Sequence, residues 1–218
     1  MKKNNKLCHL VNYEFAEIDA FSHFKKNYIK NIKINKIVLN WFIHINKRAK
    51  NSWKEDFSKG GGLMFNYFCH AIYYLEFLFG KIVSIKINAN LEKNKKIKIL
   101  KGNFFFKNLP PVKIDVKVGQ LQKIIIPTHK LKIISNNKTY VLQTKLDSLS
   151  DNFELIEFSK NSKKNLIKIL FRNKKINDDF RIKPTYKNTK KFSSWVIKKK
   201  IQSPNFFDAQ RIHMLISK

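Results

Sequence analysis

The feature that most constrains the fold of this chain is an alternation of apolar and polar residues that begins after Gly80. Residues 83–91 place an apolar side chain at every second position, and residues 112–118 repeat the pattern. Alternation at this period is typical of strands that have one buried and one solvated face. Such strands occur in antiparallel sheets, whereas the strands of parallel sheets are buried on both faces. Further candidate strands follow at 96–106, 121–126, 130–135, 138–143, 153–158 and 165–171. The sequence therefore predicts a large, mainly antiparallel sheet.

Helical spacing flanks this region. Apolar residues recur three and four positions apart within 16–30, and two helical stretches close the chain, at 186–199 and 204–216. Segments 7–13 and 34–45 read as strands because they are rich in β-branched or aromatic residues. We find no internal repeat or low-complexity linker. We expect one α+β domain over the whole chain, with an incoming strand near its start and helices packed on one face of an open sheet.

The chain is strongly basic, with a formal charge of +30 from 45 Lys and Arg against 15 Asp and Glu. Such a charge attracts nucleic acid, because Lys and Arg neutralise phosphates. Yet 112 of the 218 residues are of four types that codons of A and T alone can encode: Lys (41), Asn (24), Ile (28) and Phe (19). Only four residues are Arg. The lysines are also spread along the sequence. We therefore expect nonspecific attraction to polyanions, and a basic RNA-binding or ribosome-associated protein stays the alternative.

Three simple features disfavour other classes of protein. The longest apolar stretch, 63–80, is interrupted by polar residues and makes a poor membrane span. The N-terminus lacks a basic start followed by a short apolar run and a small-residue cleavage site. Cys8 and Cys69 are too few for a disulfide or zinc framework. We expect a cytoplasmic protein.

One segment combines glycines with side chains that can do chemistry. Gly60, Gly61 and Gly62 let the backbone turn sharply and leave free N–H groups at the start of a helix. The helix is predicted to run to about Phe79, and Gly80 is a common stop signal.

Asn66 and His70 lie four residues apart on this helix, so both project from one side, and Tyr73 continues the stripe. An amide and an imidazole together can hold a hydroxyl group and move its proton, because His titrates near neutral pH. By spacing alone such a pair is more often a satisfied polar contact in a core, and the glycines can be a tight loop. No metal site is predicted, since the other histidines lack ligand-like spacing: His9, His23, His44, His129 and His213.

The order of motifs around this helix resembles the Gfo/Idh/MocA oxidoreductases. In that family a tryptophan loop precedes a Gly-Gly-Gly–x–x–x–Asp–x–x–x–His helix, and a strand begins soon after the next glycine. Trp53, the three glycines, His70 and residues 80–85 follow this order. Asn66 stands at the family's aspartate and Phe68 at a common glycine.

The resemblance extends to both ends of the chain. Residues 12–15 with the 16–30 helix resemble the start of the family's second, substrate-side domain. Residues 179–184 and 204–216 resemble its closing portion, with Ala209 where a glycine is frequent.

The resemblance implies part of an NAD(P)-dependent oxidoreductase that acts on a sugar or cyclitol-type alcohol. His70 would be the catalytic acid–base or hydroxyl-orienting residue. The remaining implied site residues are Asn66, Tyr73 and Trp53 around the substrate, and Gly60, Gly61 and Gly62 beside the nicotinamide.

The motifs that hold the cofactor in that family are absent from these 218 residues. None of the six glycines stands in a Gly-x-Gly-x-x-Gly turn after a strand. The family's Glu-Lys-Pro motif is missing too, since Glu92 and Lys93 are followed by Asn94. We therefore expect a C-terminal domain without its Rossmann domain, inactive alone because hydride transfer needs the nicotinamide held against the substrate.

Three arrangements fit this expectation. A separate Rossmann polypeptide supplies the missing half, the start is misassigned or the gene truncated, or the chain has become a binding or oligomerisation module. A non-catalytic partner subunit is a further alternative. In the family the open sheet of this domain commonly supports subunit association, so the resemblance also implies a homo-oligomer. NAD or NADP and a sugar-like small molecule are the implied ligands.

Overall fold

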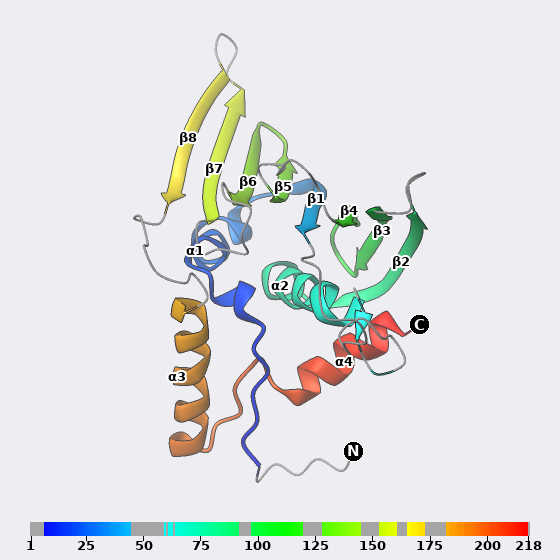
Figure 1. The fold of residues 1–218 in the computed structure, drawn as a ribbon. Helices are drawn as coiled ribbons and strands as arrows, with labels where there is room; N and C mark the ends of the chain where they lie inside the picture. Colours follow the sequence, from blue (N-terminus) through cyan, green and yellow to red (C-terminus); the bar gives the residue numbers. More distant parts are fainter. Residues whose placement is uncertain are drawn as a thin grey trace.

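The computed structural model describes residues 7–44, 59, 61–62, 64–91, 97–119, 128–144, 153–160, 165–172 and 182–217. Along the described chain the first strand lies between helical elements, seven strands then follow one another, and two helices come last (Figure 1). The helical elements are η1 (Glu14–Glu17), α1 (Asp19–Asn27), η2 (Ile29–Asn31), η5 (Met64–Phe68), α2 (Cys69–Phe79), α3 (Ile182–Lys198) and α4 (Phe206–Ile216). The strands are β1 (Ile34–His44), β2 (Ile82–Leu91), β3 (Ile97–Phe106), β4 (Val112–Gly119), β5 (His129–Ser135), β6 (Lys138–Thr144), β7 (Phe153–Lys160) and β8 (Asn165–Arg172).

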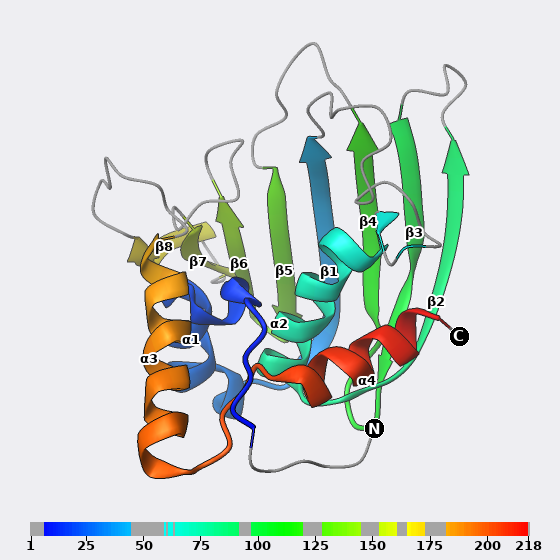
Figure 2. The same cartoon turned by 60° about the horizontal axis from the view of Figure 1, so that its bottom comes forward.

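All eight strands form one sheet in the order β2-β3-β4-β1-β5-β6-β7-β8. Neighbouring strands run antiparallel except β1 and β4, which run parallel. The labelled α-helices lie on one side of the sheet (Figure 2). The predicted fold class, α+β with a mainly antiparallel sheet and helices on one face, is confirmed.

The alternation in the sequence sets which face of each strand is buried. On β4, Val112, Ile114 and Val116 are fully buried, whereas Lys113 and Lys117 between them are exposed. The buried set points toward the helices, because side chains on a strand alternate between the two faces of the sheet.

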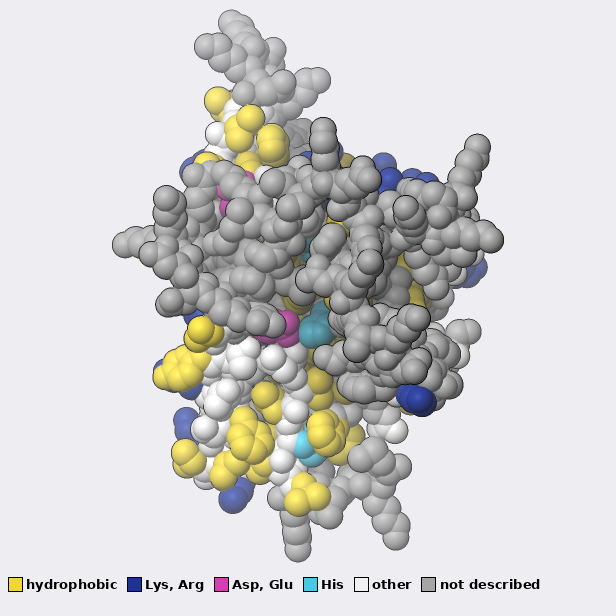
Figure 3. Space-filling model, in the orientation of Figure 1, with side chains coloured by type: hydrophobic (Ala, Val, Ile, Leu, Met, Phe, Trp, Pro, Cys, Tyr) yellow, Lys and Arg dark blue, Asp and Glu magenta, His cyan; other side chains and the backbone are white. Residues whose placement is uncertain are grey.

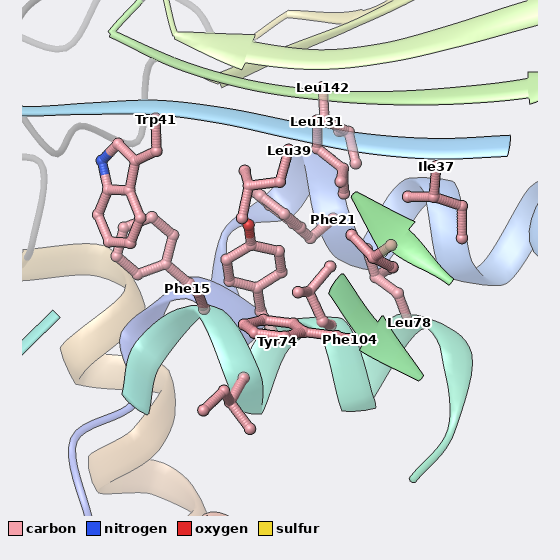
Figure 4. Packing of buried hydrophobic residues seen from close by; sticks show 14 of the residues in the cluster. Phe15, Phe21, Ile37, Leu39, Trp41, Tyr74, Leu78, Phe104, Leu131 and Leu142 are labelled. Atoms are coloured by element: carbon pink, nitrogen blue, oxygen red, sulfur yellow. The ribbon is translucent and has the colours of Figure 1, made fainter. Parts of the chain in front are cut away.

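Helix α2 packs across the centre of this buried face. Figure 4 shows Leu39 and Trp41 of β1 pointing toward α2, with Tyr74 of α2 and Phe15 of η1 against them. All four side chains are at most 3% exposed. Full burial of a large apolar side chain contributes about 1.5–3 kcal/mol relative to exposure, so these contacts fix α2 on the sheet.

Two predicted elements near the N-terminus differ from the structure. Residues 7–13 form no strand, and the Val11 N–H donates to the Pro204 carbonyl at 3.1 Å, which ties the segment to the start of α4 instead of a sheet edge. The predicted 16–30 helix is divided into η1, α1 and η2. Ile18 is extended (ψ 129°) and buried at the N-cap of α1, so tertiary packing of this β-branched residue interrupts the helix.

The last two helices match their predicted positions closely. Helix α3 begins four residues before the predicted position 186. Helix α4 begins with a capping box, in which the Asn205 side chain accepts the backbone N–H groups of Phe207 and Asp208, and the Asp208 carboxylate accepts the Asn205 N–H. His9 accepts the N–H of Phe206 at 3.1 Å, a structural use of that imidazole.

Two further predictions concern membranes and residues beyond the described ranges. Within the described residues, every helix is too short or too polar to cross a bilayer. The predicted strand at 121–126 lies outside the described residues, as do Trp53 and Gly60.

Candidate functional site

The glycine-led helix forms, but its first turn is wide. Gly61 is buried and Gly62 has a φ of 79°, a left-handed conformation that glycine adopts without strain. Residues 64–68 then form a π-helical turn, η5, which runs directly into α2. Short π-helical segments occur frequently at functional sites. Asn66 and His70 lie on either side of the junction between η5 and α2, and both are half-buried.

The imidazole of His70 faces the carboxylate of Glu14 from η1. His70 Nδ1 lies 3.4 Å from Glu14 Oε2, and the side chains are 22% and 16% exposed. Both of these atoms are inaccessible to solvent. The exposed part of the imidazole therefore lies away from Nδ1. In Figure 3 an acidic and a histidine side chain lie side by side near the centre of the face, over η1 and α2.

Burial and charge act on His70 in opposite directions. Desolvation lowers its pKa, and the negative charge of Glu14 partly offsets this effect. A lowered pKa keeps the imidazole neutral at pH 7. A carboxylate at Nδ1 favours the tautomer with the proton on that nitrogen, which leaves Nε2 free to accept a proton.

Tyr13 connects His70 to Tyr73. The ring centroid of Tyr13 lies 5.4 Å from that of His70 and 5.0 Å from that of Tyr73. Burial raises the pKa of both phenols, so both keep their protons at neutral pH. The predicted substrate-side residue Tyr73 thus belongs to the same cluster as His70.

Cys69 lies beside this cluster and is not a nucleophile. Its thiol donates to the Phe65 carbonyl at 2.8 Å, and burial raises the pKa of Cys69 to about 12. A thiol is reactive only as the thiolate, so Cys69 is inert at neutral pH.

Polar contacts fix the C-terminal end and the middle of α2. At its C-terminal end the Glu76 carboxylate accepts the Ile82 N–H at 2.9 Å and pairs with Lys81 and with Arg211 of α4. Near its middle the Tyr74 hydroxyl lies 3.1 Å from His129 Nε2 in the core. These contacts hold the helix that carries His70.

Neither Glu14 nor Glu76 stood out in the sequence. Glu14 precedes α2 in the chain by more than fifty residues, and only the tertiary fold brings it to His70. The one signal in the sequence was the presence of Glu76 inside an apolar helix. A buried acidic residue is rarely without a partner, so this position indicates an ion pair.

Neither Gly102 nor the acidic residues that the structure describes form a cofactor or metal site. A Cβ on Gly102 would lie 1.9 Å from the Lys86 carbonyl oxygen, so this glycine serves the close approach of β2 and β3. Among the described residues no cluster of three or more His, Cys, Asp or Glu could hold a metal ion. With no Gly-x-Gly-x-x-Gly turn in the sequence, the residues present do not by themselves fit a dinucleotide cofactor.

One surface cavity of about 410 Å³ lies away from His70. It opens between the end of α1 and the β5–β6 hairpin, and Asn27, Tyr28, Asn136 and Tyr140 are among its lining residues. None of the predicted site residues lines it.

Comparison with solved structures finds the same fold in two oxidoreductases and in a transcriptional regulator. Levoglucosan dehydrogenase in its apo form superposes with a TM-score of 0.71 at 15% identity, covering 99% of this chain and 64% of that one. Gal80p, a transcriptional regulator from Kluyveromyces lactis, gives 0.72 at 17% identity, covering 95% and 58%. A putative NADPH-dependent oxidoreductase from Desulfitobacterium hafniense gives 0.71 at 9% identity, covering 94% and 59%.

At these identities the comparisons show a shared fold. The chain spans about 58–64% of the length of these three structures. No protein-family model and no curated protein matches the sequence. The chain therefore has the fold of part of each of these structures, in agreement with the fold that the sequence resemblance implies.

Proposed function

We propose that this chain is a single domain that presents a sugar or cyclitol-type alcohol to NAD or NADP held by a Rossmann domain. The observation that carries the proposal is the His70–Glu14 pair at the head of a glycine-led helix. It is supported by the fold shared with levoglucosan dehydrogenase, another structure of which is described as a complex with NADH and L-sorbose. The two free cysteines fit a cytoplasmic location.

In this proposal the residues of the chain move a proton and orient the alcohol. The substrate hydroxyl donates its proton to Nε2 of the neutral His70 imidazole. Glu14, at Nδ1, holds the ring and stabilises the imidazolium that forms. Asn66, Tyr73 and Trp53 are proposed to bind the remaining hydroxyl groups, and Gly60, Gly61 and Gly62 to let the nicotinamide approach.

We also propose that copies of the chain associate through the open face of the sheet, at its β7–β8 side. Phe158, Ile167 and Ile169 are exposed there. With the buried Ile156 they form two cross-strand pairs, and we call the four residues the β7–β8 patch. Ile167 and Ile169 are 68% and 47% exposed, an apolar surface that association would cover.

A non-catalytic role is the second candidate, because the fold is shared with a protein described as a transcriptional regulator. Fold alone does not distinguish the two functions. The His70–Glu14 pair favours the first.

The test joins this chain to the Rossmann half of a dehydrogenase and measures NAD(P)-dependent alcohol oxidation. The chain alone should show no turnover, and His70→Ala in the restored enzyme should reduce kcat by about 100-fold or more, the usual contribution of a general base. His23→Ala on α1 is the matched control and should leave kcat unchanged. Turnover by the chain alone, or an unchanged rate for His70→Ala, would contradict the proposal.

A further inference from the structure

The side of the sheet opposite the helices carries a set of lysines. Because α1, α2 and α4 cover one face (Figure 2), the residues that alternate with the buried ones lie on the other face. On β1 to β5 these positions include seven lysines, which we call the lysine face: Lys36, Lys86, Lys101, Lys113, Lys117, Lys130 and Lys132.

The strand register arranges this face in rows across the sheet. One row joins Lys86, Asn103 and Lys113 on β2, β3 and β4. In the next row Asn88 lies opposite Lys101. Rows two residues apart along a strand are about 6.6–6.8 Å apart. Ammonium and amide groups therefore alternate over β2 and β3, and the second row continues from Lys101 to Asp115 on β4.

The charge of the lysine face is largely uncompensated. Among the described residues no ion pair involves any of its seven lysines, and Asp115 is the one acidic residue at a position between them. Acidic residues elsewhere, such as Glu17 and Asp19, pair with lysines of α3. Lysines that are dispersed in the sequence are thus gathered by the fold, and a surface of this kind attracts an anionic partner.

A phenylalanine interrupts the charge on this face. Phe105 alternates with the buried Phe104 and Phe106, is half-buried, and lies with its ring centroid 5.9 Å from Lys86 Nζ. Aromatic rings beside lysines are the usual arrangement for single-stranded nucleic acid, in which bases stack on the ring while phosphates contact the charges. Exposed amides such as Asn88 can bond base edges.

We propose that the lysine face binds single-stranded nucleic acid without sequence preference. Lysine supplies point charges for phosphates, whereas the forked base contacts that give specificity are made chiefly by arginine, which this face lacks. The proposal does not depend on the oxidoreductase function, since it uses the opposite side of the sheet from His70.

The test measures fluorescence anisotropy of labelled 20-nucleotide oligo(U) and oligo(dT) from 50 to 400 mM NaCl. The triple variant Lys101→Gln, Lys113→Gln and Lys117→Gln removes three charges from the lysine face. The slope of log K against log salt should fall by roughly 2, and affinity at 0.1 M salt by about 100-fold. The control triple, Lys190→Gln, Lys198→Gln and Lys200→Gln, removes three charges near α3 and should change affinity by less than about threefold.

Phe105→Ala tests the stacking contribution and should weaken binding roughly tenfold without altering the salt slope. Equal losses in the two lysine triples would overturn the proposal, because total charge would then explain the binding. So would equal affinity for poly-glutamate, or binding only to vesicles of phosphatidylserine and phosphatidylcholine. Circular dichroism of each variant confirms that the fold is intact.

Discussion

The buried carboxylate of Glu76 should be one of the most costly side chains to remove. We expect Glu76→Ala to lower the free energy of unfolding by about 3–5 kcal/mol, the usual cost of leaving a buried charge without its partner. The Glu76 side chain is 5% exposed. It joins the end of α2 to the first residues of β2 and to α4, so three elements lose a shared contact.

The magnitude follows from the individual contacts. The Ile82 N–H bond to the carboxylate, at 2.9 Å, contributes about 1.5–3 kcal/mol because its acceptor is charged. Arg211, 33% exposed, would lose its carboxylate partner and adds a smaller amount, roughly 1–2 kcal/mol, because solvent screens its charge. Lys81, 64% exposed, contributes less than about 1 kcal/mol. For a chain of this size each kcal/mol shifts Tm by about 2–4 °C, so a decrease of about 6–20 °C is expected.

Thermal denaturation followed by circular dichroism at pH 7 checks this prediction. Lys81→Met serves as the control and should cost less than about 1 kcal/mol. Arg211→Met combined with Glu76→Ala should cost clearly less than the sum of the single changes, because the pair is then removed together. A loss below about 1 kcal/mol for Glu76→Ala would refute this reasoning about α2.

Three further predictions concern other parts of the sheet. Burial lowers the pKa of His129 to about 3, below the unfolded value of 6.5. As the pH falls, the unfolded chain therefore binds this proton before the folded chain does. The free energy of unfolding should fall by up to about 1.4 kcal/mol per pH unit between pH 6.5 and pH 3. Urea titrations of His129→Leu should show a weaker dependence of this free energy on pH. Gly102→Ala should cost about 1–3 kcal/mol in the same assay, because its Cβ would overlap the Lys86 carbonyl; an unchanged midpoint would refute the proposed close approach. Replacing Ile167 and Ile169 of the β7–β8 patch with Glu should shift the sedimentation equilibrium toward monomer, whereas an unaltered mass would exclude this patch as the interface.

The sheet was largely predictable because several of its strands, most clearly β2 and β4, alternate apolar and polar residues. Strands β2 to β8 were expected within two residues of their observed ends, since burial on one face imposes the same period on the sequence. The break at Ile18 was not predictable, because helical spacing continues through it and only packing against the core makes it extended.

The candidate site was predictable only in part. The sequence placed His70 and Tyr73 on one helix, and the structure links their rings through Tyr13. Glu14 was missed, because its relation to His70 is a long-range contact with no local pattern. The π-helical turn at 64–68 was also missed, since nothing in its composition separates it from an α-helix.

The position of β1 has a consequence for how the molecule assembles. Strands β2, β3 and β4 pair consecutively, as do β5 to β8, and each group needs only short-range connections. Strand β1, made before either group, is their sole described link within the sheet, pairing with residues some seventy to one hundred positions later. Closing such distant pairings is slow and entropically costly. During synthesis, the chain as far as β5 must therefore leave the ribosome before the two groups of strands can join through β1. Substitutions in β1 should then change the folding rate more than substitutions in the outer hairpins.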